Sequence, residues 1–234
     1  TPINTTPALV SPSNYTVTEI AAGAFQGNAN LLSVALPSTL TSIGNQTFFQ
    51  CAELGSFNDE GGIFIPAGVT NIGGQALGRC KALKSIFVHE LNPKYSWLDG
   101  VLYNIDRTEL VQYPSSKLGM TYTIPPTIRK ILPYAVEANP YIVLVEMGDS
   151  VEIIGADAFR NLDSLVVVRF GKGVGSANGT IGDNAFADCY ALGSAVFAGA
   201  SPASANIGTN VFNNADAGFT IQHFASSEIY KTAF

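Results

Sequence analysis

The amino-acid sequence predicts a β-rich repeat solenoid of the α/β type: a right-handed stack of about eight coils, each about 23 residues long. Two observations predict this fold. Apolar residues recur at fixed intervals along most of the chain, and short stretches alternate between apolar and polar side chains, as half-buried strands do. The 23 glycines and 12 prolines are spread along the chain and disfavour long helices. We expect parallel strands from successive coils to form a ladder on the concave face.

The composition argues against several other classes of protein. Hydrophobic residues make up 47% and charged residues 13% of the chain, which disfavours intrinsic disorder. A net charge of −6 disfavours nucleic-acid binding, which needs a basic face to meet phosphates. The longest apolar runs, 141–145 and 165–168, are far shorter than the roughly 20 residues that cross a bilayer. We therefore expect no nucleic-acid partner and no membrane span in this chain.

Each repeat can be followed from an isoleucine at its start. After Ile20, the residues 5, 8, 11, 14 and 16 positions later are Phe25, Asn28, Leu31, Val34 and Leu36. The same spacing starts at six more isoleucines: Ile43, Ile72, Ile131, Ile154, Ile181 and Ile207. The last positions form a short strand with alternating faces, and in the second copy they place Phe57 inward. The Ile-Gly pair that opens most copies marks a turn, after which a phenylalanine enters the core.

One coil departs from the pattern and suggests how the chain is divided. Residues 89–124 hold an enlarged repeat, in which Val101–Asn104 and Glu109–Gln112 are predicted to be strands joined as a hairpin through residues 105–108. We predict an N-terminal tail or linker at 1–14 and one repeat domain at 15–234, closed by a C-terminal cap at 219–234. A cap is expected because the end coil of a solenoid must shield its apolar face.

The repeat resembles a known family. Val69–Ile86 reads VTNIGGQALGRCKALKSI, and Thr180–Cys189, TIGDNAFADC, repeats it closely. These stretches resemble the BspA-like, or treponemal-type, leucine-rich repeat surface proteins, and the resemblance runs from about residue 15 to the end. It implies a leucine-rich repeat solenoid, export from a bacterium to an extracellular or cell-surface location, and a role in adhesion. The motif specifies the fold well and the ligand poorly.

Motifs that carry chemistry are not found in the sequence. The two histidines, His89 and His223, lack partners at metal-ligand spacing, and there is no HExxH motif. The glycine-rich stretch 171–176 lacks the residue order of a phosphate-binding loop, and no GxSxG motif occurs. We predict no catalytic residue, cofactor or metal. A carbohydrate-active enzyme would need two carboxylates brought together, such as Glu146 and Glu152, and nothing in the sequence does this.

The three cysteines share one position of the repeat. Cys51, Cys80 and Cys189 stand where other copies carry Asn, Leu or Ala, which is typical of a small buried position. We expect buried free thiols. Because Cys51 and Cys80 belong to adjacent coils, a disulfide between them is the alternative.

The function that these observations favour is a non-catalytic binding module of an exported bacterial surface protein. Its partner would be a host or bacterial surface protein or glycan; a structural spacer and a carbohydrate-active enzyme are the alternatives. The candidate surface consists of outward strand positions: Phe87, Leu144, Glu146, Val167, Arg169 and Val196. Leu144 and Val167 are expected on adjacent rungs, flanked by Glu146 and Arg169, an apolar pair with a charged rim that suits a protein contact. The alternative is an ordinary sheet surface, since strands favour β-branched residues. The sequence predicts no particular oligomeric state.

Overall fold

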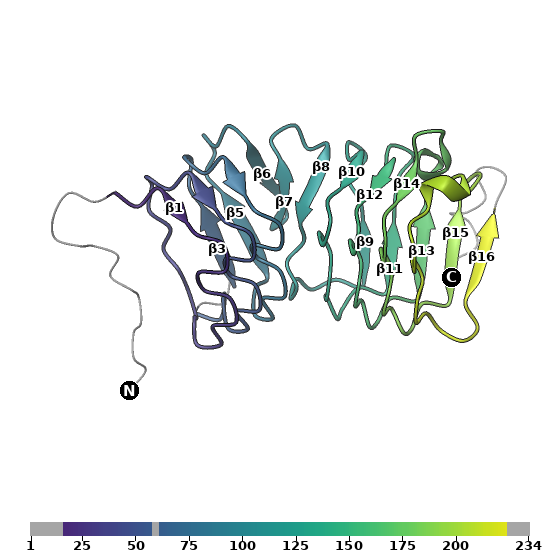
Figure 1. Ribbon diagram of the computed structural model, residues 1–234, viewed down its shortest axis with the longest axis horizontal. Coiled ribbons are helices and arrows are strands. Elements are labelled where there is room, and N and C mark those ends of the chain that lie inside the picture. Colours follow the sequence, from purple (N-terminus) through teal and green to yellow (C-terminus); the bar gives the residue numbers. More distant parts are fainter. Residues whose placement is uncertain (1–15, 58–60, 224–234) are drawn as a thin grey trace. The chain divides into compact units, whose positions relative to one another are not determined.

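The computed structural model describes residues 16–57 and 61–223 and divides into two compact units. Unit 1 comprises Thr1–Asp106 and Gln112–Lys117, and unit 2 comprises Arg107–Val111 and Leu118–Phe234. Each unit is a stretch of β-solenoid and is described by itself (Figure 1). The predicted tail at 1–14, and residues 224–234 of the predicted cap, lie outside the described residues, so these boundaries stay predictions.

Unit 1 is built on two parallel sheets and a hairpin. The first sheet has three short strands: β1 (Glu19–Ile20), β2 (Ser42–Ile43) and β4 (Asn71–Ile72). The second has two longer strands: β3 (Gly62–Ile65) and β5 (Ser85–Val88). Their inward residues are buried and the intervening residues are more exposed, as the alternating sequence predicts.

The hairpin of unit 1 lies one strand earlier than predicted. It pairs β6 (Tyr95–Leu98) with β7 (Val101–Asn104) in antiparallel register. The two-residue turn is Asp99-Gly100, both with positive φ, at 50° and 74°. This dipeptide is a strong hairpin signal that the sequence analysis missed, because it fits a turn whose twist matches that of the strands. The second predicted strand also exists, as β8 (Glu109–Gln112).

Unit 2 contains two longer parallel ladders, whose strands follow one another from teal to yellow in Figure 1. One ladder joins β8 to β10 (Lys130–Ile131), β12 (Ile153–Ile154) and β14 (Thr180–Ile181). The other consists of β9 (Thr121–Thr123), β11 (Leu144–Glu146), β13 (Val167–Phe170), β15 (Ser194–Phe197) and β16 (Thr220–His223). Every strand pairs with the equivalent strand of the next coil, so the predicted parallel stacking is confirmed.

The register confirms the repeat that starts at isoleucine. In unit 1 Ile20 pairs with Ile43, which pairs with Ile72. In unit 2 an unbroken row runs across five coils: Leu110, Ile131, Ile154, Ile181 and Ile207. Leu110 takes the isoleucine position in the enlarged coil. Because that coil lacks the rest of the motif, the spacing alone did not identify it.

The second coil differs from the prediction. Phe57, predicted to point inward, lies in a turn with 71% of its surface exposed. The strand starts five residues later, and its buried residues Ile63 and Ile65 pair with Ile86 and Val88. The extra residues of this coil therefore precede the strand and displace it along the chain. In the first coil Leu31 is buried as predicted, but no strand forms over residues 31–36.

Phenylalanines from successive coils stack in the core, as predicted. In unit 1 the rings of Phe25 and Phe48 stack with centroids 5.4 Å apart. In unit 2 Phe186 stacks on Phe159 at 4.9 Å and on Phe212 at 5.6 Å. Phe48, Phe159 and Phe186 are fully buried. Stacked aromatic pairs add about 0.5–1.5 kcal/mol to the free energy gained from burial.

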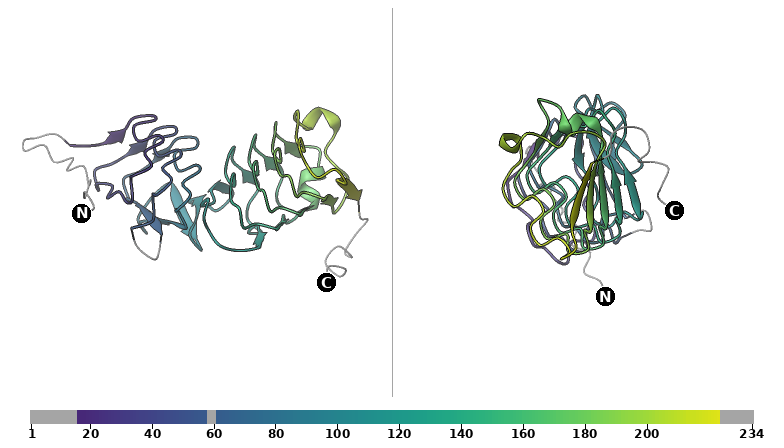
Figure 2. Two further views of the ribbon diagram at one scale, coloured as in Figure 1. Left: turned by 90° about the horizontal axis from the view of Figure 1, so that it is seen from below. Right: turned by 90° about the vertical axis from the view of Figure 1, so that its right-hand side faces the viewer.

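Opposite the long strands, the chain makes tight turns instead of helices. The described residues contain no α-helix and two short 3-10 helices, η1 (Lys172–Gly175) and η2 (Ser204–Asn206). Each typical coil places left-handed residues three and seven positions after its isoleucine, for example Asn184 (φ 53°) and Asp188 (φ 59°). Asn and Asp tolerate this conformation better than other non-glycine residues do. The green-to-yellow coils of unit 2 stack closely along this side (Figure 2).

The glycine of the Ile-Gly pair has a different role from the predicted one. A Cβ atom on Gly155 would lie 2.5 Å from the backbone nitrogen of Pro133, and one on Gly182 would lie 2.5 Å from that of Ala156. Both distances are shorter than van der Waals contact allows. Glycine is therefore required because the backbone of the preceding coil approaches closely, and not because the chain turns there.

Candidate functional site

The candidate surface lies on the outward face of the long ladder in unit 2. Leu144 on β11 pairs with Val167 on β13, and in the same pair of strands Glu146 lies beside Arg169. All four side chains are half-buried, whereas Val145 and Val168, which point the other way, are fully buried. The structure thus brings together the four residues that the sequence analysis placed on adjacent rungs.

Glu146 and Arg169 form an ion pair on this face. Arg169 Nη1 lies 2.9 Å from Glu146 Oε1, and Thr123 Oγ1 donates a hydrogen bond of 3.2 Å to Glu146 Oε2. Both charged side chains are mostly covered, with 17% and 22% of their surfaces exposed. Because both side chains are largely buried, salt screens their attraction less than it screens that of a fully exposed ion pair. It presents a fixed charge distribution beside Leu144 and Val167.

Three further apolar residues extend this surface at the start of the strands. Met120, Val143 and Val166 directly precede β9, β11 and β13. They are neighbours, because Val143 N donates to Met120 O at 2.7 Å and Val166 N donates to Val143 O at 2.8 Å. Met120 is 69% and Val166 43% exposed. We call Met120, Val143, Leu144, Val166 and Val167 the apolar strip.

Three members of the strip are not among the predicted residues, because strand alternation assigns only every second position to the outward face. A signal for two of them was present, since Val143 and Val166 directly precede Leu144 and Val167 in runs of apolar residues. Exposed and half-buried apolar residues on three neighbouring coils are more informative than single exposed apolar residues, which are normal on protein surfaces.

The other two predicted residues do not contribute to the apolar strip. Val196 on β15 pairs with Arg169 and with Gln222, but it is only 7% exposed and contributes little accessible surface. Phe87 belongs to β5 in unit 1, where its ring meets that of Trp97 edge to face at 5.0 Å. Phe87 is therefore considered with unit 1 and not with the apolar strip.

Carboxylates that could serve catalysis are held by arginines. Glu146 pairs with Arg169, whereas Glu152 Oε1 lies 3.3 Å from Arg129 Nη1. The two carboxylates thus have separate partners and are not arranged as a pair across a shared site. Within residues 16–57 and 61–223, no three His, Cys, Asp or Glu side chains are grouped so that they could hold a metal ion.

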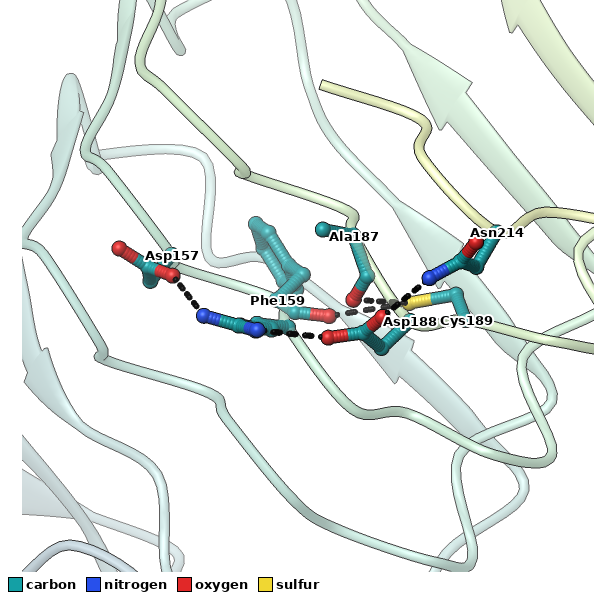
Figure 3. A network of polar contacts seen from close by, with 7 residues as sticks. Asp157, Phe159, Ala187, Asp188, Cys189 and Asn214 are labelled. Atoms are coloured by element: carbon teal, nitrogen blue, oxygen red, sulfur yellow. Dashed lines mark hydrogen bonds and ion pairs between the residues drawn. The ribbon is translucent and has the colours of Figure 1, made fainter. Parts of the chain in front are cut away.

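A second polar network ties together coils on the turn side of unit 2 (Figure 3). Arg160 Nη1 lies 3.1 Å from Asp157 Oδ1, and Arg160 Nη2 lies 2.8 Å from Asp188 Oδ2 in the next coil. Asp188 Oδ1 in turn accepts a hydrogen bond of 2.7 Å from Asn214 Nδ2, one coil further on. The hydrogen bond to Asp188 raises the pKa of the Arg160 guanidinium. The network joins three coils and pairs one guanidinium with two carboxylates, so its role is structural.

All three cysteines are free and fully buried, as predicted, and Cys51 and Cys80 form no disulfide. Each thiol lies within hydrogen-bond reach of a carbonyl in an earlier coil: Cys51 Sγ to Phe25 O at 3.0 Å, Cys80 Sγ to Phe48 O at 3.1 Å and Cys189 Sγ to Phe159 O at 3.1 Å. Burial raises the pKa of both Cys80 and Cys189 to about 12. A catalytic cysteine needs a lowered pKa, so these thiols are structural.

Comparison with known families rests on the repeat itself. A family model described as the BspA type leucine-rich repeat region matches residues 9–96 and 112–234 in six copies. The chain belongs to this family. The unmatched internal segment, 97–111, lies within the enlarged coil, in which the β6–β7 hairpin and Leu110 replace the usual BspA-type motif.

Solved structures agree with this assignment. A leucine-rich cell surface protein from Faecalibacterium prausnitzii is 27% identical, with a TM-score of 0.68 over 90% of this chain and 58% of that one. The pneumococcal vaccine antigen PcpA is 20% identical, with a TM-score of 0.55 over 90% of this chain and 61% of that one, and shows the shared fold. The chain thus spans less than two thirds of either relative.

No curated protein matches the sequence. In the part of the chain that the structure describes, no helix is long and apolar enough to cross a membrane.

Proposed function

We propose that this chain is a non-catalytic binding module of a bacterial surface protein and that it contacts a protein or glycan through the apolar strip. The observation that carries the proposal is the strip itself, which crosses three adjacent coils and is bordered by the Glu146–Arg169 ion pair. An apolar centre with a charged rim is the usual composition of a protein interface. A protein partner therefore fits this surface better than a glycan does.

The family supports a location outside the cell. One similar structure is described as a cell surface protein and another as a vaccine antigen. A binding module on the cell surface would meet host or bacterial surface molecules, which accords with an adhesive role. Leucine-rich repeat folds provide extended surfaces for such contacts without any catalytic group.

A double variant, Leu144→Lys with Val167→Lys, tests the proposal. Both side chains are half-buried on the outward face, so lysine stems can reach solvent and the fold should persist, as circular dichroism would show. Binding to glycan arrays and to immobilised, purified host matrix proteins should be lost, because two charges interrupt the apolar strip. The matched control is Thr220→Lys with Gln222→Lys, which changes two exposed polar positions on β16 at the end of the same ladder.

Three results would overturn the proposal. If the folded double variant binds as the parent does, the strip is an ordinary sheet surface. If the parent binds neither array nor matrix protein, the chain acts as a spacer. Turnover of a glycan or peptide by the parent would place it among the enzymes.

A further inference from the structure

Unit 1 carries a second surface, formed by aromatic side chains of β5, its neighbours and the hairpin. Phe64 on β3 pairs with Phe87 on β5, and both point outward. The ring of Phe64 meets His89 edge to face at 6.1 Å, and that of Phe87 meets Trp97 of β6 at 5.0 Å. We call Phe64, Phe87, His89 and Trp97 the aromatic surface.

These rings are exposed although they belong to an ordered framework. Phe64 is 51% and Trp97 39% exposed. The hairpin is fixed to β5 by a backbone hydrogen bond of 2.8 Å from Ile86 N to Gly100 O. The ring of Phe87 leans over Gly62, where a Cβ atom would lie 2.5 Å from Phe87 Cε2. Exposed aromatic rings held by a rigid sheet lose little conformational entropy when a partner binds.

Basic residues lie next to the strands that carry the aromatic surface. Residues 79–98 contain four basic side chains and one acidic one, Glu90, whereas residues 1–78 contain four acids and no base. Lys84 precedes β5 and packs its alkyl chain near Gly61, the residue before Gly62. Lys94 precedes β6, three residues before Trp97. Both lysines are exposed, and neither forms an ion pair with another described residue. They are available to a ligand with negative charge.

We propose that the aromatic surface binds an acidic segment of a partner protein. Apolar side chains of the segment would pack on Phe64, Phe87 and Trp97, while its carboxylates pair with Lys84 and Lys94. Aromatic residues dominate the binding energy of protein interfaces, and complementary charge around them speeds association and selects the partner. A polypeptide is favoured because one segment can supply both apolar side chains for the rings and carboxylates for the lysines. This site is independent of the apolar strip in unit 2.

The single tryptophan makes the test specific. Because Trp97 is the only tryptophan in the sequence, its fluorescence reports on the aromatic surface in the intact chain. The probe is a synthetic twelve-residue peptide with equal numbers of Glu and Leu. We expect a saturable blue shift of Trp97 emission that weakens as salt is added. Peptides of Lys with Leu, or of Glu with Ser, should bind at least about tenfold more weakly, since each lacks one half of the recognition.

Matched variants separate charge from ring contacts. Lys84→Glu with Lys94→Glu should weaken binding of the Glu–Leu peptide about tenfold or more, whereas Lys172→Glu, an exposed lysine of unit 2, should leave it unchanged. Phe64→Ser should weaken binding of the Glu–Leu peptide likewise, and Leu118→Ser, at a more exposed apolar position of unit 2, should not. Absence of a saturable shift, equal binding of the Lys–Leu peptide, or unchanged binding by the lysine variant would overturn the proposal. A response to heparin but not to the peptide would assign the surface to an anionic glycan instead.

Discussion

Phe159 occupies the phenylalanine position of its repeat, and its contacts show how this position forms the core. Its ring is fully buried and stacks on that of Phe186 at 4.9 Å, while its carbonyl oxygen lies 3.1 Å from the thiol of Cys189. The ring and the thiol position therefore join successive coils by packing and by a weak hydrogen bond. Residues at these two positions therefore contribute to stability through contacts between coils.

Phe159→Ala should lower the free energy of unfolding by about 3–5 kcal/mol, because it removes a buried ring and leaves a cavity. Urea unfolding followed by circular dichroism measures the change. Tyr190→Ala, at a position that is 59% exposed, serves as the control and should stay within about 0.5 kcal/mol of the parent. Equal losses for the two variants would contradict the assignment of Phe159 to the core.

The three cysteines should react slowly with a thiol reagent in the folded protein, because they are fully buried and burial raises the pKa of each thiol. After denaturation without reductant, all three should react at once. A thiol count of one in the denatured sample would instead reveal a disulfide.

Stability should also depend on the thiols at high pH. The pKa values of Cys80 and Cys189 are raised in the folded state from 9.0 to about 12, so above pH 9 the unfolded chain releases protons that the folded protein keeps. Stability is therefore unaffected by these groups below pH 9 and falls as the pH rises toward 12. Urea midpoints between pH 7 and pH 11 should fall less steeply for Cys80→Ala with Cys189→Ala than for the parent. Parallel pH profiles would show that the thiols do not contribute.

At the scale of elements, the distance between neighbouring coils limits which side chains fit where their backbones approach. The Ile-Gly pairs lie where two backbones approach, and the Arg160 network spans the turns of neighbouring coils. Both features act between coils and not within one, because a single coil is too short to bury its own apolar face.

Gly155→Ala should lower the melting temperature and reduce the free energy of unfolding by about 1–3 kcal/mol. The new methyl group would overlap the backbone of Leu132 and Pro133. Gly148→Ala is the matched control. A Cβ atom there meets nothing within 4 Å, so its melting temperature should stay close to that of the parent. If both variants melt like the parent, the close approach of the coils is not a constraint.

Arg160→Leu should lower the free energy of unfolding by about 1–3 kcal/mol, since it leaves the largely buried carboxylates of Asp157 and Asp188 without their cation. Arg129→Leu removes an ion pair with Glu152 that is far more exposed, and it should cost less than about 1 kcal/mol. Chemical denaturation of both variants measures the difference. A larger loss for the Arg129 variant would contradict the role given to the Arg160 network.

At the scale of the whole molecule, the contacts are local because each coil pairs with its neighbours in the ladder. Stability of such a chain is approximately a sum of terms from each coil and from each contact between adjacent coils. A weakened coil should therefore open its surroundings before distant coils respond.

Hydrogen exchange of the Phe159→Ala variant tests this locality. The amides of Val136 and Phe159, which bond across coils to Ala158 O and Ala185 O, should exchange faster than in the parent. The amide of Phe48 in unit 1 should change least. A uniform increase in both units would indicate one cooperative structure instead.

The sequence by itself determined the repeat, the inward isoleucines and phenylalanines, the buried cysteines and the family. These follow from periodicity, because a side chain's position in a coil decides whether it faces the core. Contacts between coils could not be predicted in the same way. Gly155 was interpreted as a turn residue, although it is the backbone of the preceding coil that leaves no room for a side chain there.

Tertiary structure alone decided what covers each outward residue and where an insertion enters its coil. Val196 is covered although its strand position points outward, whereas Met120 and Val166 are exposed although neither was a predicted outward position. The extra residues of the second coil moved its strand past Phe57, and Leu110 joined the row of isoleucines. Periodicity indicates the face on which a residue lies. Its solvent exposure and its strand register are determined by neighbouring coils, which are distant in sequence.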